Sequence, residues 1–115
     1  MKYMMLIYGN EASSKHADKP AMEKTLAAYV AYTQAMQKAG VMLAGHRLQP
    51  SSAASTVRVV DGKSEVLDGP YADTKEQLGG YYLIEVPDLD AALAWAARCP
   101  GASRGRIEVR PVWAM

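Results

Sequence analysis

Residues 80–98, GYYLIEVPDLDAALAWAAR, join a strand pattern to a helix pattern across a two-residue break. The β-branched and aromatic residues of 80–86 are typical of a strand. Asp88 is a favourable helix N-cap, and the residues after it carry apolar side chains at helical spacing. The stripe expected to be buried consists of Leu89, Ala92, Leu93 and Ala96. We therefore expect a strand followed directly by an amphipathic helix over 89–98.

The segments on either side extend this pattern. Pro100 and Gly101 end the helix, and residues 105–113, GRIEVRPVW, alternate between apolar and charged side chains, as a strand does when one face is buried. The chain opens in the same order: a short apolar strand over 2–8, a helix over about 18–38 and a strand over 41–48. The apolar positions of that first helix, expected to be buried, are Met22, Leu26, Tyr29, Val30, Thr33 and Met36.

A β-hairpin is predicted between these two halves. Residues 55–60 and 63–67 are strand-like, and Asp61-Gly62 between them is the strongest two-residue hairpin signal. Gly69-Pro70 then turns the chain, and residues 71–78 are expected to form a short irregular or one-turn helical stretch.

The order of these elements predicts an α+β domain over residues 1–115. It fits a ferredoxin-like split βαβ sheet with an inserted β-hairpin and two helices on one face. The opposite face of such a sheet needs cover, and 115 residues supply no third layer. We therefore expect a homodimer that pairs through this open face.

Composition excludes several classes of protein. Half of the residues are apolar, 22% are charged and the net charge is +1, so we expect a folded chain with no general attraction for nucleic acid. The apolar runs 3–8 and 91–97 are too short to span a membrane. Cys99 is the only cysteine, so no disulfide can form within the chain, and we expect a buried thiol and a cytoplasmic protein.

Residues 68–82, DGPYADTKEQLGGYY, closely resemble the signature of the YCII-related, or DGPF-domain, family, with Tyr71 where the motif has Phe. The likeness continues through 91–96 and 107–112. It implies a ferredoxin-like fold that pairs as a dimeric α+β barrel. Members similar to this chain are often encoded beside extracytoplasmic-function sigma factors, which implies a regulatory or accessory role. In a shorter branch a His after an Arg-Pro-Ala-like run pairs with an Asp; here Lys19-Pro20-Ala21 precedes Met22, so that His is absent.

Asp73 is the first candidate functional residue, and two interpretations of it stay open. Asp73 and Glu76 have capping-box spacing, which is a structural role. Alternatively, Asp68, Asp73, Lys75 and Glu76 crowd nine residues between a turn and two glycines. A carboxylate beside a cation acts as a general base or as an anchor for a ligand.

His46 is the second candidate, as a proton partner that titrates near neutral pH. By alternation it shares a strand face with Met42 and Ala44, where a packed histidine is the other interpretation. His16 is expected to be a solvated loop residue. The two histidines are 30 positions apart with no metal-binding motif, so we expect no metal and no cofactor.

The last strand carries Arg106, Glu108 and Arg110 on one face, either as a solvated or dimer salt-bridge surface or as an anion-binding wall. Tyr8 and Tyr71 stand at strand and turn ends, where pockets form. We expect a small-molecule-binding protein or an enzyme of unknown substrate, with an acid/base or anion-binding cleft in each half of the homodimer. The alternative is a non-catalytic regulatory or accessory module that contacts a sigma factor.

Overall fold

The computed structural model describes residues 1–15 and 17–114. His16, considered above as a loop residue, therefore lies outside the described residues. The strands are β1 (Lys2–Gly9), β2 (Met42–Arg47), β3 (Ser55–Val60), β4 (Lys63–Asp68), β5 (Gln77–Glu85) and β6 (Arg106–Pro111). The helices are α1 (Glu11–Lys15), α2 (Lys19–Lys38) and α3 (Leu89–Arg98), with short 3-10 turns η1 (Ser51–Ala53) and η2 (Pro100–Ser103).

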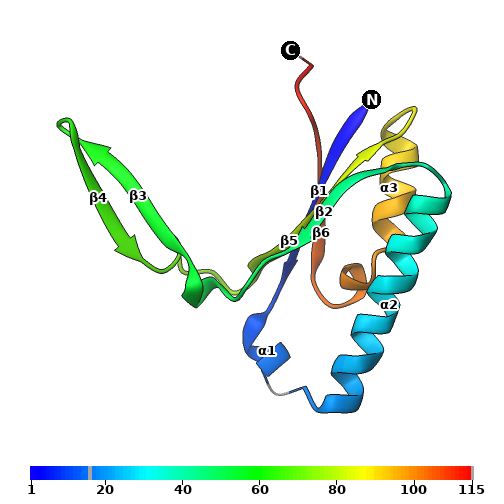
Figure 1. Cartoon of the computed structure of the whole chain (residues 1–115), viewed down its shortest axis with the longest axis horizontal. Helices are drawn as coiled ribbons and strands as arrows, with labels where there is room; N and C mark the ends of the chain where they lie inside the picture. Colours follow the sequence, from blue (N-terminus) through cyan, green and yellow to red (C-terminus); the bar gives the residue numbers. More distant parts are fainter. Residues whose placement is uncertain (16, 115) are drawn as a thin grey trace.

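Four strands form one antiparallel sheet in the order β2-β5-β1-β6. This is the order of a ferredoxin-like split βαβ domain, and the sequence prediction of an α+β fold is confirmed. Both long helices lie on one side of the sheet (Figure 1). Both helices begin at an aspartate N-cap: the side chains of Asp18 and Asp88 accept hydrogen bonds from Ala21 N and Ala91 N, both at 2.9 Å. The cap at Asp88 was expected from the sequence.

The hydrophobic core lies between the sheet and the two helices. Alternate residues of β1 and β5 point to this side and are buried, as the pleat of a strand requires. The buried side chains are Tyr3, Met5, Tyr82 and Ile84 from the strands and Tyr32, Met36, Ala92 and Ala96 from the helices. The predicted helix stripes are correct only in part. Five residues expected to be buried are between 46% and 60% exposed: Met22, Leu26, Val30, Leu89 and Leu93.

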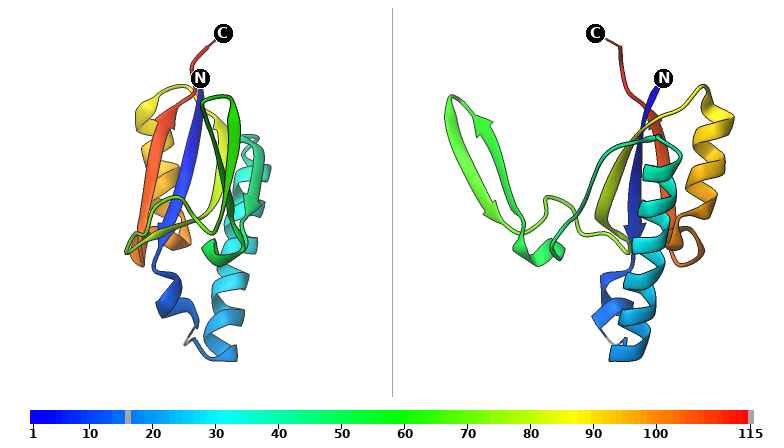
Figure 2. Two further views of the ribbon diagram at one scale, coloured as in Figure 1. Left: turned by 90° about the vertical axis from the view of Figure 1, so that its left-hand side faces the viewer. Right: turned by 45° about the vertical axis from the view of Figure 1, so that its right-hand side comes forward.

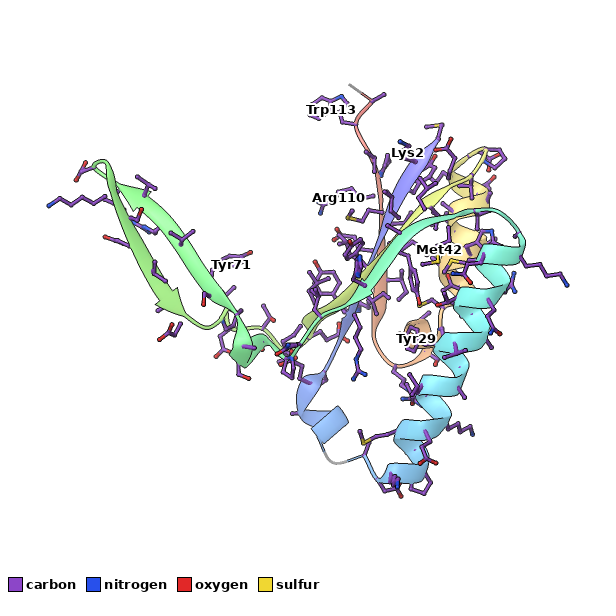
Figure 3. All side chains as sticks on the ribbon, in the orientation of Figure 1. Lys2, Tyr29, Met42, Tyr71, Arg110 and Trp113 are labelled. Atoms are coloured by element: carbon purple, nitrogen blue, oxygen red, sulfur yellow. The ribbon has the colours of Figure 1, made fainter. Side chains whose placement is uncertain are left out.

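The other side of the sheet carries no helix, and we call it the open face. Cross-strand pairing defines its rows. One row is Ala44, Leu83, Met4 and Arg110, the next is His46, Tyr81, Leu6 and Glu108, and the third is Leu78, Tyr8 and Arg106. The middle of this face is apolar and half-buried, and its β6 edge is charged. Figure 3 shows Arg110 on this side and Met42 on the helix side.

The expected alternation of His46 with Met42 is wrong. Met42 pairs with Ile84 and Ala44 pairs with Leu83, so Leu43 is an extra residue that forms a β-bulge. A single inserted residue reverses the side to which the rest of the strand points. As a result Met42 packs against the core and His46 lies on the open face.

The predicted hairpin is present, and it stands away from the domain. Asp61 and Gly62 have φ of 51° and 76°, which is the backbone that a two-residue turn of this kind needs. We call residues 55–68, comprising β3 and β4, the arm. It forms a separate two-stranded sheet and projects from the side of the open face (Figures 1 and 2). The stretch after it, 71–76, is irregular and contains no helical turn.

Within the described part of the chain, no helix is both long enough and apolar enough to cross a membrane.

The buried tyrosines predict how stability changes with pH. Burial raises the pKa of Tyr29, Tyr32 and Tyr82 above the ordinary value of 10.0. Because a phenol is neutral when protonated, the folded state holds these protons more tightly than the unfolded chain does. The resulting stabilisation is fully present below pH 10.0 and is lost as the pH rises through the range between the unfolded and folded pKa values.

We therefore expect the free energy of unfolding to fall above about pH 10 and Tyr29→Phe to make that fall shallower. Denaturant titrations at a series of alkaline pH values measure both. An identical decline in wild type and Tyr29→Phe would contradict the assignment.

Candidate functional site

A groove of about 530 Å³ lies where β1 and β6 meet the loop before β5. Its lining residues are Tyr8, Lys75, Glu76, Arg106, Ile107 and Glu108. The set combines two cations, two carboxylates and one phenol. A concave site with a few convergent polar groups is the usual form of a small-molecule site.

Strand pairing brings the two walls of the groove together. β1 lies between β5 and β6 in the sheet, and Tyr8 pairs with Arg106 on β6 and with Leu78 on β5. A bulge beside this pair leaves Gly79 as the extra residue of β5. The backbone just before β6 approaches β1 closely at Gly105, where an added Cβ would meet the backbone of Tyr8. The groove therefore depends on register and on a missing side chain.

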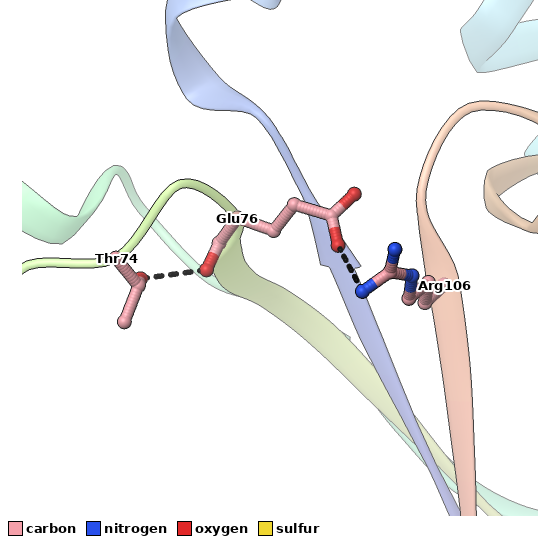
Figure 4. Close-up of polar contacts among 3 residues, drawn as sticks. All are labelled: Thr74, Glu76 and Arg106. Carbon is pink, nitrogen blue, oxygen red and sulfur yellow. Dashed lines mark hydrogen bonds and ion pairs between the residues drawn. The ribbon is translucent and has the colours of Figure 1, made fainter.

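Glu76 and Arg106 face each other across the groove (Figure 4). Glu76 Oε1 and Arg106 Nη1 are 3.8 Å apart. The Glu76 side chain is 29% exposed, whereas that of Arg106 is 85% exposed. This separation exceeds the 2.7–2.9 Å of a direct charge-assisted hydrogen bond, so both groups keep bonding capacity for a third partner.

The loop that carries Glu76 is held by local hydrogen bonds. Thr74 Oγ1 donates to the carbonyl of Glu76 at 2.6 Å, and Gln77 Nε2 donates to the carbonyl of Thr74 at 2.5 Å. The other amide atom of Gln77, Oε1, accepts from the backbone N–H of Glu11 at 3.0 Å. These bonds fix the direction in which Glu76 leaves the loop.

The groove collects Tyr8, Lys75 and Glu76 from the residues that the sequence suggested. Arg110 lies outside its lining, but on the same face, and donates to Glu108 Oε2 at 2.6 Å. Glu108 is a groove residue, so Arg110 is connected to the site through it. The arginine-bearing face of β6 is thus a wall of the groove at Arg106 and a charge pair at Arg110.

Asp68, Tyr71 and Asp73 lie outside the groove lining. Asp68 ends the arm, Tyr71 is 84% exposed, and Asp73 is exposed in the loop. The capping interpretation of Asp73 is wrong, because no helix follows it and its carboxylate accepts no hydrogen bond from the described residues.

His46 lies on the open face at the edge strand β2, with its ring centroid 5.7 Å from that of Tyr81. It is exposed and does not line the groove. Cys99 is buried as expected, and burial raises the pKa of its thiol. Among the described residues no three His, Cys, Asp or Glu side chains gather in the manner of metal ligands.

Sequence reasoning did not distinguish Arg106 from the other charged residues of β6. Its alternation with Glu108 and Arg110 was visible, but that pattern gives the three residues equal weight. What distinguishes Arg106 is the pairing of β6 with β1, which places it opposite Tyr8. No local signal in the sequence reports that register.

Comparisons with known proteins agree with this fold. The family model for the YCII-related domain matches residues 1–115. An uncharacterised protein of Rhizobium meliloti strain 1021 is 39% identical over 114 residues, which cover 97% of this chain and 92% of that protein. The structure of 5-chloro-2-hydroxyhydroquinone dehydrochlorinase from Burkholderia phenoliruptrix, in complex with 2,5-dihydroxybenzoquinone, superimposes with a TM-score of 0.56 at 15% identity. That match covers 99% of this chain and 94% of the enzyme.

Proposed function

The chain belongs to the YCII-related domain family, and we propose that it binds a small anionic molecule in the groove of its open face, with Glu76 as the proton-exchanging group. The carrying observation is the Glu76–Arg106 pair, which stands 3.8 Å apart beside Tyr8. Lys75, which precedes Glu76 in the loop, adds a second cation to the lining of the groove. The structural neighbour is an enzyme in complex with 2,5-dihydroxybenzoquinone, so the same fold holds a small acidic molecule in that protein.

The geometry favours a ligand with an acidic hydroxyl or a carboxylate. A guanidinium fixes an oxyanion by charge-assisted hydrogen bonds, and a phenol donates one more. A half-buried carboxylate on the opposite wall accepts a proton from a neighbouring hydroxyl or returns it to carbon or oxygen. In this proposal Arg106 and Tyr8 position the ligand, and Glu76 moves the proton.

The proposal includes a homodimer formed through the open face. The apolar residues at the centre of that face, such as Leu6 and Leu83, are only half-buried in one chain. Pairing two copies removes them from water and places both grooves at the edges of one shared interior. We propose Asp73 and His46 as residues of this assembled form, because each is exposed on a single chain.

The test is ligand-induced stabilisation by 2,5-dihydroxybenzoquinone, benzoate and inorganic phosphate. We expect at least one of the organic anions to raise the melting temperature, because the groove pairs cations with a phenol. Arg106→Gln should weaken that binding about tenfold or more, since it removes a charge-assisted bond. Arg104→Gln is the matched control: this exposed arginine donates to Thr25 Oγ1 at 2.7 Å and lies outside the groove.

Two further variants separate the acid/base candidates. Glu76→Gln is nearly isosteric and should abolish proton exchange with a bound ligand, whereas Asp73→Asn should not. The readout is the pH dependence of ligand affinity, which a purely structural change leaves in place.

If Arg104→Gln and Arg106→Gln weaken binding equally, the groove is not the site.

A second candidate is the non-catalytic module that contacts a sigma factor. The observation in its favour is the exposed apolar side of the arm, with Val57 and Val66 exposed at 63% and 69%. If the chain is such a module, we expect none of these anions to stabilise the protein, and the arm is the surface that contacts the sigma factor.

A further inference from the structure

We infer that the arm of one protomer packs on the open face of a second copy of this chain and closes the partner's groove. This deepens the proposed function, since it rests on the open-face homodimer and names the element that completes each site. The inference starts from the arm's two sides.

The arm has one side with three neighbouring valines and another side that mixes charged and apolar residues. Val57 pairs with Val66, and Val59 lies beside them on the same side. On the opposite side Arg58 and Glu65 form an ion pair at 3.5 Å. The three valines are between 63% and 69% exposed, so this side has no cover within its own chain.

A two-stranded hairpin alone in water is marginally stable, so an arm of this composition needs a surface to pack against. Its base is nevertheless fixed. Glu11 accepts hydrogen bonds from the backbone N–H and the hydroxyl of Ser51, both at 2.7 Å, and Gly69 N donates to Ala54 O at 2.6 Å. Thr56 Oγ1 donates to Gly69 O at 2.9 Å. The arm therefore leaves the domain in a defined direction.

The surface area indicates how much cover is missing. The chain exposes 8575 Å², about 2,400 Å² more than a compact monomer of its mass. Its radius of gyration is 16.1 Å, against about 13 Å for a compact chain of this length. A stable interface takes about 800 Å² from each partner, so the excess is enough for a dimer in which the arm takes part.

A second copy of this chain can cover both the valine side of the arm and the open face. The arm projects from the side of the open face (Figure 2), so two chains that meet by their open faces direct each arm toward the other chain. A two-fold axis makes the contact reciprocal: the valine side of each arm meets the part of the partner's open face, on the side of Leu83, that the two paired faces leave uncovered. The groove beside Tyr8 then becomes an enclosed site.

The first test compares two lysine variants of the arm. Val66→Lys places a charge on the valine side, and Leu67→Lys makes the same change at the next residue on the opposite side, where Leu67 is 56% exposed. Light scattering over a concentration series should show a wild-type dimer. We expect at least a tenfold weaker dimer for Val66→Lys, because its ammonium group would be buried in the interface. Leu67→Lys should change the dimer affinity less than threefold, because its charge stays in water.

The second test locates the arm on the partner. Val66→Cys chains are mixed with Leu83→Cys chains or with Leu26→Cys chains and treated with a short bismaleimide. Leu26 lies on the helix side and is 60% exposed, so it reacts at least as readily, while native Cys99 is 3% exposed. We expect a covalent heterodimer with Leu83→Cys and little with Leu26→Cys.

The outcomes separate this inference from the proposed function. A wild-type dimer that Val66→Lys and Leu67→Lys weaken equally, or cross-linking to Leu26→Cys in preference to Leu83→Cys, overturns the placement of the arm and leaves the open-face dimer and its groove intact. A wild-type chain that is monomeric at every concentration overturns both the arm contact and the dimer, while anion binding is judged separately by Arg106→Gln.

Discussion

Gly105→Ala should destabilise the fold by about 3 kcal/mol or more, because the new methyl group has no room. An ideal Cβ at Gly105 collides with the carbonyl oxygen of Tyr8 and lies 3.0 Å from Gly9 Cα. These are backbone atoms of β1, so no side-chain rotation relieves the collision. Either β6 separates from β1 or the pair shifts register. Denaturant unfolding at one fixed protein concentration measures the loss.

Gly9→Ala is the matched control, since nothing lies within 4 Å of its added Cβ. It should change the unfolding free energy by less than about 0.5 kcal/mol or increase it slightly. Equal effects of the two substitutions would show that β1 and β6 do not approach as described. Gly105→Ala should also weaken anion binding in any chains that stay folded, because Tyr8 and Arg106 on either side of the contact line the groove.

Local signals were sufficient for most of the sheet and helix elements. Three predicted features depend on a few neighbouring residues each: the Asp61-Gly62 turn, the N-cap Asp88 and the alternation along 105–113. Their physical basis is local backbone preference, and the structure shows all of them. The element order then leaves few topologies for a four-stranded antiparallel sheet.

Register and burial depend on partners distant in the sequence, and there the predictions were weaker. The bulge at Leu43 moved His46 to the open face, and no residue type around it announces a bulge. Of the two alternatives for residues 71–78, the irregular one is correct for 71–76, where Thr74 and Gln77 make hydrogen bonds within the loop, and β5 begins at Gln77. A capping pattern is therefore weak evidence when no periodic apolar stripe follows it.

The candidate site shows the same division. The motif-rich loop suggested Lys75 and Glu76, and the end of the first strand suggested Tyr8; all three line the groove. Their partner Arg106 is about thirty residues downstream of Glu76, and only sheet order brings the two together. Sequence reasoning identifies one wall of such a groove more readily than the groove itself.

Ile84→Ala should cost about 2–5 kcal/mol, the range for emptying a fully buried aliphatic site. Ile84 is 0% exposed and belongs to the cluster that joins the sheet to Tyr32 and Met36 of α2. Its neighbours are held by strand pairing and helix packing, so they relax little into the vacated space. The unfolding midpoint in guanidinium measures the loss, and an unchanged slope shows that the same structure unfolds.

Leu93→Ala removes a similar amount of hydrocarbon from α3, at a side chain that is 47% exposed in the single chain. Alanine favours helix, so we expect a change below about 1 kcal/mol. In a dimer formed by the open face, this helix surface stays in water, so the small effect is also expected for the dimer. A different result would contradict the open-face dimer: Leu93→Ala costs as much as Ile84→Ala, and its effect grows with protein concentration. The helices would then form the interface, because a side chain in water has no contact in a partner chain to lose.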